Sequence, residues 1–231
     1  MPQEDEFDGL RSLSHLQDPD PRNLFFVRWD SAGEFLPLTV KEQHADVASV
    51  TLHAGVPDLI ATQLETTKNL YLYSWFVYRF HPVAEHHALT CLEFALKTRF
   101  SNEIRAGAVP FRGNHPTLPY LLRYAIASGV VKNEGFESWH DMVRIRARHR
   151  VEKERFRKMR DGNIERMIWK DSEVVITEED RNTDYVGILL DTIPTIRNAY
   201  AHGSPSLDNG SLHTIRIVAE IINQLFPQPA V

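Results

Sequence analysis

The chain has 231 residues, of which 42% are apolar and 25% charged, and its formal net charge is −5. This is an average composition for a soluble globular protein, and the length suits one large domain or a domain with appendages. No apolar run approaches the roughly 18 residues of a membrane span, and a single cysteine, Cys91, excludes an internal disulfide framework and a cysteine-based metal cluster. Residues 1–6 are acidic, unlike the basic start of a secretory signal, so we expect a cytoplasmic protein.

An N-terminal extension is predicted over residues 1–56. Its first 22 residues are polar and alternate Asp with Pro at one point, which predicts a loose arm. The apolar segments 23–30 and 34–40 predict a small β-hairpin. The four-residue span Thr39–Glu42 has the spacing of a capping box and predicts a helix to about residue 53.

Helical patterns dominate residues 57–231. The predicted helices cover about residues 57–80, 83–104, 117–128, 138 into the 160s, 177 or 183 to 202, and 211–226. Ser138 is expected to cap the fourth of these, Gly129 to close the third, and Pro194 to kink its helix or mark a fresh first turn. Short connections and little strand predict an all-α protein, an up-and-down helical bundle with the small N-terminal extension attached.

A basic helical insertion is predicted at about residues 132–182. Within it, residues 142–170 hold eleven Lys and Arg against four Asp and Glu, a net charge of +7 that leaves −12 on the rest of the chain. A basic stripe on an acidic body is a candidate surface for following a phosphate backbone, and a solvated helix of mixed charge is the alternative. The candidate RNA-binding cations are Arg144, Arg146, Arg148, Arg150, Arg155, Arg157 and Lys158.

The most informative segment is RNAYAH, residues 197–202. An Arg that can hold a phosphate and a His that can move a proton near neutral pH are the minimum for cleaving RNA without a metal. Arg197 and His202 are five positions apart, so an ideal helix separates them by roughly 140°. A helix end at His202, or two copies of the motif facing each other in a dimer, would bring the groups together. The alternative is structural: an Arg in a salt bridge and a His at its own helix C-terminus.

Arg197, Asn198 and His202 at the end of a late helix resemble the Arg-x(4–6)-His signature of HEPN domains, in which a polar residue often follows the Arg. Residues 88–97 and 118–131 also resemble two earlier elements of that family, and the likeness spans about residues 57–226. The basic insertion departs from the family pattern, and residues 1–56 match nothing in it.

The resemblance implies a helical bundle that commonly dimerises with its motifs facing each other. Many HEPN proteins are metal-independent endoribonucleases in toxin–antitoxin, defence or RNA-processing roles, and others are inactive and bind nucleotides or proteins. For this chain it implies RNA as substrate, a homodimer, an antitoxin or other protein partner, no membrane and no cofactor. Arg197, His202 and Asn198 are then the expected catalytic residues, and Glu93 is a supporting residue because some relatives place an acid opposite the motif.

Three other features have simpler explanations. The sequence HPVAEHH, residues 81–87, lacks the order and spacing of a metal-binding helix, so no metal site is expected. Cys91 lies in an apolar helical pattern and is expected in the core rather than as a nucleophile. The aromatic residues Tyr71, Trp75, Phe76 and Tyr78 are expected to pack in the core rather than to stack on bases.

Overall fold

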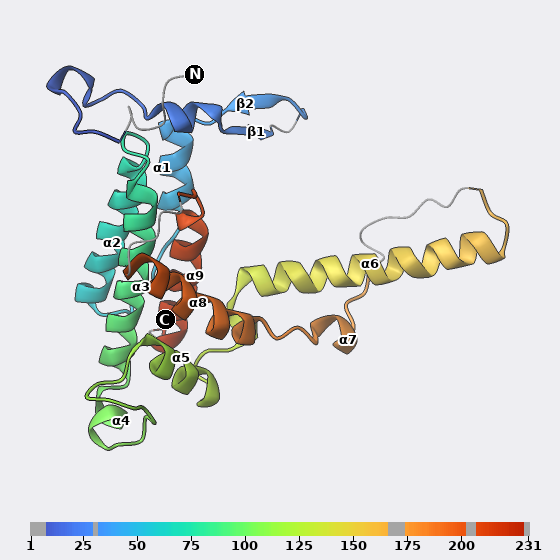
Figure 1. Cartoon of the computed structure of the whole chain (residues 1–231). Helices are drawn as coiled ribbons and strands as arrows, with labels where there is room; N and C mark the ends of the chain where they lie inside the picture. Colours follow the sequence, from blue (N-terminus) through green and yellow to red (C-terminus); the bar gives the residue numbers. More distant parts are fainter. Residues whose placement is uncertain (1–7, 30–31, 166–173, 202–206, 229–231) are drawn as a thin grey trace.

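The structure is a computed structural model, and it describes residues 8–29, 32–165, 174–201 and 207–228. The described part is mostly helical, with one two-stranded antiparallel sheet (Figure 1), which confirms the predicted all-α bundle with a small N-terminal hairpin. The helices are α1 (Val40–Ala48), α2 (Asp58–Tyr73), α3 (Phe80–Arg99), α4 (Ser101–Arg105), α5 (Leu118–Ala127), α6 (Glu137–Asp161), α7 (Glu178–Arg181), α8 (Tyr185–Ala201) and α9 (Ser211–Leu225). Strands β1 (Val27–Trp29) and β2 (Phe35–Pro37) form the hairpin, with Val27 opposite Pro37. None of the described helices is both long enough and apolar enough to cross a membrane.

Helix α3 is the centre of the bundle. It packs most extensively against α2 and α9, and α5 and α8 lie against it as well (Figure 1). Small side chains at Ala84, Ala88 and Ala95 are fully buried and let neighbouring helices approach its backbone closely. Leu89, Leu92 and Leu96 fill the space between them. Because α3 contacts α8, its polar residues can reach the RNAYAH segment.

Several helix boundaries differ from the sequence-based prediction. Helix α2 ends at Tyr73 rather than near residue 80, and α3 already begins at Phe80, so Pro82 lies in a first turn, where its missing N–H costs nothing. Helix α1 ends at Ala48 instead of about residue 53. Helix α6 begins at Glu137 with Phe136 at its N-cap position, so Ser138 lies inside the helix. The predicted Ser138 cap is therefore wrong.

Two predicted helix ends are confirmed by the backbone. Gly129 follows α5 with φ of +69°, and the N–H of Val130 donates to the carbonyl of Ala125, which is the bonding expected of a glycine-closed helix end. Thr39 and Glu42 form the predicted capping box at the start of α1.

The N-terminal residues are tied to the bundle by buried side chains. Asn23 donates both amide hydrogens, to the carbonyls of Ser74 and Trp75, each at 2.9 Å. Gln43 of α1 donates to the carbonyl of Tyr71 at 2.7 Å. Val47, Val50 and Val56 belong to the same core cluster as α3 and α9. The connection between α2 and α3 is thus held by residues far away in the sequence.

Helix α6 projects from the bundle (Figure 1). Trp139, Val143 and Ala147 are its buried residues, spaced by four positions on one stripe, and all lie in its first half. No described residue of α6 beyond Ala147 is buried, so its second half extends away from the core. Asp180 of α7 accepts two hydrogen bonds from Arg150 at 3.0 and 2.8 Å and anchors α7 against α6.

Candidate active site on helix α8

Helix α8 carries the described part of the RNAYAH segment. It runs without interruption through Pro194, so this residue does not start a new helix. Leu189 and Ile193 are buried on its inward stripe, and the spacing of four residues continues that stripe to Arg197. A cation therefore stands on the inward face, where the earlier turns of the helix carry apolar side chains.

Arg197 meets an acidic residue of α3. Its Nη2 lies 3.7 Å from Oε2 of Glu93, and Lys97 donates to the other carboxylate oxygen of Glu93 at 2.6 Å. The Glu93 side chain is 15% exposed and that of Arg197 is 38% exposed. Within the described part of the chain Arg197 donates no hydrogen bond, so its guanidinium is oriented by the ion pair yet keeps donors for an anion from solvent.

The other two expected catalytic residues are placed differently. Asn198 is exposed on α8 and points away from the stripe that carries Arg197. His202 lies outside the described residues, as do Gly203 and Pro205 that follow it in the sequence. The structure therefore brings together Arg197 and the expected supporting residue Glu93. The distance between Arg197 and His202 lies outside what the structure describes.

A buried carboxylate lies two turns before Glu93 on the same helix, and it was not expected from the sequence. Glu85 of α3 is 5% exposed. Its Oε2 accepts a hydrogen bond from the Tyr200 hydroxyl at 2.7 Å, and its Oε1 accepts one from the Thr214 hydroxyl of α9. Burial, and then the hydrogen bond to Glu85, raise the pKa of Tyr200 above its ordinary value of 10, so this phenol remains a donor at neutral pH. The sequence did contain a signal for the burial of Glu85, because this acid lies on the same helical stripe as Leu89 and Leu92.

A buried histidine lies one turn before Glu85. The Ser74 hydroxyl donates to the carbonyl of Tyr71 at 2.6 Å, so its oxygen can only accept from Nε2 of His81 at 3.1 Å. Nδ1 of His81 is then the acceptor for the Ser211 hydroxyl at 2.7 Å. Burial lowers the pKa of His81 to about 4, so the ring is neutral near pH 7.

The neighbouring groups considered for a metal are also engaged in local contacts. Nδ1 of His87 lies 2.8 Å from the Thr67 hydroxyl, and burial lowers its pKa. Cys91 is buried, and burial raises the pKa of its thiol to about 12, which confirms a core role. Tyr71, Trp75 and Tyr78 are buried as expected, whereas Phe76 is only partly buried.

The expected RNA-binding cations differ in their contacts and in their exposure. Arg144 pairs with Glu137 and Asp141, Arg146 bonds to Asn182 and Thr183, and Arg150 bonds to Asp180. Arg148 is exposed, and Arg155 is half-buried. Arg157 and Lys158 are exposed on the projecting half of α6 and form no ion pair with another described residue.

The arrangement provides a half-exposed guanidinium held by a carboxylate, above a buried polar cluster that joins α3, α8 and α9. Such a guanidinium can bind the oxygens of a phosphate through charge-assisted hydrogen bonds. Comparison of this chain with protein-family models, curated proteins and solved structures finds no match.

Proposed function

We propose that this protein is a metal-independent endoribonuclease of the HEPN type, in which Arg197 and His202 cleave RNA at a homodimer interface. The observation that carries the proposal is the half-exposed Arg197 of the RNAYAH segment on α8, which forms an ion pair with Glu93 of α3. The resemblance of residues 197–202 to the HEPN signature supplies the reaction class.

The chemistry requires three groups. A base removes the proton of the 2′-hydroxyl, whose oxygen attacks phosphorus, while an acid protonates the departing 5′-oxygen. The products are a 2′,3′-cyclic phosphate and a 5′-hydroxyl. A cation stabilises the charge on the phosphoryl oxygens during the attack. Arg197 serves as this cation, and His202 serves as base or acid. One imidazole cannot fill both roles in one step, which favours a second motif from a partner copy.

RNA binding outside the reaction centre falls to the exposed cations of α6. Arg157 and Lys158 are accessible on the projecting half of that helix. Arg144, Arg146 and Arg150 would first have to leave intramolecular partners, so their contribution to RNA binding is smaller.

The test is cleavage of single-stranded RNA by the purified protein in EDTA, with mapped product ends. Cyclic phosphate ends and resistance of a substrate with a 2′-deoxynucleotide at the cleavage site are the expected results. Arg197→Ala and His202→Ala should each lower the cleavage rate by at least about 100-fold, the scale of one general acid–base or phosphate contact. Arg197→Lys keeps the positive charge but loses the forked donors of the guanidinium. Its cleavage rate should lie between those of the two alanine variants and that of the wild type.

The matched control is Arg105→Ala, which removes an exposed arginine of α4 with local partners only. Its cleavage rate should equal that of the wild type. Cleavage that survives both Arg197→Ala and His202→Ala would come from another site or a contaminating nuclease and would contradict the proposal.

A non-catalytic helical module is the second candidate, and the ion pair between Arg197 and Glu93 favours it. In that case the pair only fixes α8 on α3. The expected results are absence of RNA cleavage by the wild type and a lower free energy of unfolding for Arg197→Ala. Because the pair is partly exposed, this loss should stay below about 1 kcal/mol.

A further inference from the structure

Glu85 joins three helices at one point in the core. The residue belongs to α3, and its two carboxylate oxygens accept hydroxyl hydrogens from Tyr200 of α8 and Thr214 of α9. It is 5% exposed, and within the described residues no Lys, Arg or His pairs with it. An acid buried with hydroxyl donors alone is costly to keep in a core, so its retention needs a reason beyond packing.

The directions of these hydrogen bonds are set by the donor groups. A phenol and a secondary alcohol each have one hydrogen, and both hydrogens point at the carboxylate. Neither aliphatic nor amide side chains could replace Glu85 without leaving one hydroxyl unsatisfied. An amide would turn its own N–H₂ group toward one of the two oxygens.

The contact acts on the last turn of α8. Tyr200 lies one residue before the end of the helix at Ala201, and three residues after Arg197. Terminal turns lack part of their backbone hydrogen bonding and fray unless side chains hold them. The buried apolar residues of α8 end at Ile193, so the contact with Glu85 holds a turn of the helix that has no buried apolar side chain.

We propose that Glu85 and Tyr200 are positioning residues that hold the last turn of α8, and with it Arg197, in the geometry needed for RNA cleavage. This inference rests on the proposed ribonuclease function for its catalytic part. The arrangement divides the work between two acids of α3. Glu93 orients the guanidinium by an ion pair, and Glu85, two turns earlier, fixes the helix that carries it.

The same buried region extends to α1 and α2. Gln43 donates to the Ser74 oxygen at 3.1 Å, Ser74 accepts from His81, and His81 accepts from Ser211 of α9. Ser211 and Thr214 are three positions apart on the first turn of α9. The N-terminal turn of α9 is thus fixed from two sides, which gives Thr214 a defined position against Glu85.

Tyr200→Phe is the test, because it removes one hydroxyl and keeps the ring. Tyr124→Phe is the control: Tyr124 of α5 is partly buried edge-on to Phe100, and its hydroxyl bonds to no other described residue. Two quantities are measured, the hydrogen exchange of the backbone amides of residues 197–201 and the kcat and KM for RNA. Loss of one buried hydrogen bond should speed that exchange by about two- to tenfold. It should also lower kcat at least as much, with KM unchanged within about twofold.

Glu85→Gln extends the test, since its amide can satisfy one hydroxyl but not both. It should speed the same exchange, and adding Tyr200→Phe to it should add little, because both changes break one contact. Exchange in Tyr200→Phe equal to that in Tyr124→Phe would overturn the positioning role. So would faster exchange with unchanged kcat. A wild type that cleaves no RNA overturns the proposed function and the catalytic part of this inference, while the exchange data still decide whether Glu85 holds α8.

Discussion

At the scale of single residues, Arg197, Glu93 and Glu85 place charge on stripes of α8 and α3 that are otherwise mostly apolar. Helix α8 keeps one stripe from Leu189 through Ile193 to Arg197, and α3 supplies an acid opposite that stripe. Replacing apolar residues by charged ones costs stability unless the charges are paired. Glu93 is paired with Arg197 and Lys97, whereas Glu85 accepts from two hydroxyl groups, which offset the cost of its burial in part.

The buried neutral His81 predicts a pH dependence of stability. The folded pKa of about 4 lies below the unfolded value of about 6.5, so the unfolded state binds a proton first as the pH falls. The contribution is fully present above pH 6.5 and is lost between pH 6.5 and 4, by about 3 kcal/mol in total. Urea unfolding from pH 7.5 to 3.5 measures it.

His81→Gln is the matched variant, because it removes the titration and keeps hydrogen-bonding groups near Ser74 and Ser211. The difference in unfolding free energy between wild type and variant should shrink as the pH falls through this window. Carboxylates such as Asp20 titrate in both proteins and cancel. A difference that is constant with pH would show that His81 titrates normally in the fold.

At the scale of elements, α6 is the unusual part of the fold. It has 25 residues, about 37 Å of helix, but only its first half is held by the core. A partly buried bidentate pair of Arg150 with Asp180 fixes its middle, and hydrogen bonding to Arg150 lowers the pKa of Asp180. The half beyond this anchor presents Arg157 and Lys158 to solvent. The described second half of α6 buries no side chain, and an exposed cationic surface of this kind is a candidate site for a polyanion.

Removing Arg157 and Lys158 together should weaken RNA binding and reduce its salt dependence. Two lost phosphate contacts lower the slope of log affinity against log salt by about 1.4 for a single strand. Titration of a labelled, non-cleavable RNA between 50 and 300 mM salt measures the slope. Arg144→Ala is the control on the same helix: its guanidinium already bonds to Glu137 and Asp141, so its slope should change by less than half as much. Equal slopes for the wild type, the double variant and Arg144→Ala would show that the second half of α6 does not bind RNA.

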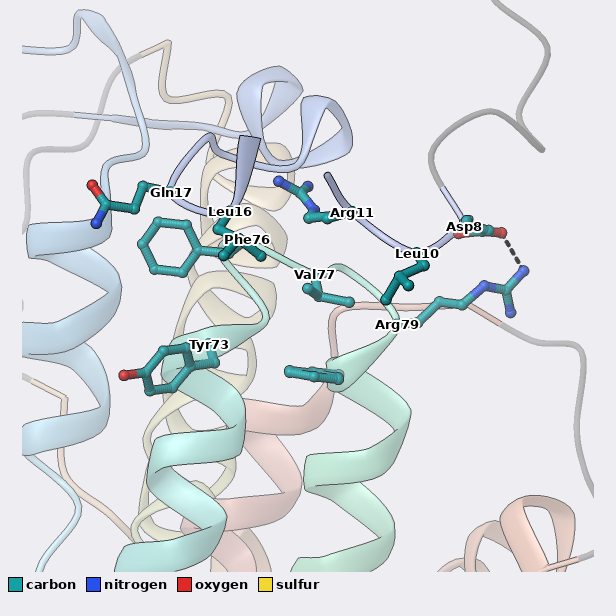
Figure 2. A pocket seen from close by; sticks show the side chains of 11 residues that line it. Asp8, Leu10, Arg11, Leu16, Gln17, Tyr73, Phe76, Val77 and Arg79 are labelled. Carbon is teal, nitrogen blue, oxygen red and sulfur yellow. Dashed lines mark hydrogen bonds and ion pairs between the residues drawn. The ribbon is translucent and has the colours of Figure 1, made fainter. Parts of the chain in front are cut away.

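At the scale of the whole molecule, the N-terminal residues are part of the bundle architecture. An apolar cavity of about 810 Å³ lies between residues 8–17 and the connection of α2 to α3 (Figure 2). Tyr73, Phe76 and Val77 line it, and at its rim Asp8 pairs with Arg79. Asn23 and Asp20 bond to the same connection. The extension thereby fixes the start of α3, the helix that carries Glu85 and Glu93.

Asn23→Ala should destabilise the whole protein. The change removes the side-chain donor of both carbonyls and leaves that of Trp75 with the backbone N–H of Asp20, at a cost of about 1–3 kcal/mol in the free energy of unfolding. Urea unfolding gives the value. Asn69→Ala is the control, because Asn69 bonds only to the carbonyl of Glu65 on its own exposed helix face, and it should cost less than about 0.5 kcal/mol. Equal losses would mean that the extension is not coupled to the core.

The sequence alone determined the helical architecture of this protein. The apolar spacing in α9, the glycine after α5 and the capping box before α1 are local signals, and local signals survive in the fold. The end of α2 at Tyr73 could not be read, because the aromatic pattern continues through Trp75 and Tyr78, which remain buried after the helix has ended. The spacing of apolar residues predicts which side chains are buried, but it does not show whether their backbone is helical or a turn.

The sequence also determined the motif of residues 197–202 and the acid Glu93 as its candidate partner. Only the tertiary structure decided that Glu85 bonds to Tyr200 and Thr214, and that Arg146 and Arg150 of the basic helix bond to residues around α7. The physical reason is sequence distance. These contacts join residues about 30 to 130 positions apart, and no periodicity within one helix encodes which faces of two helices will meet.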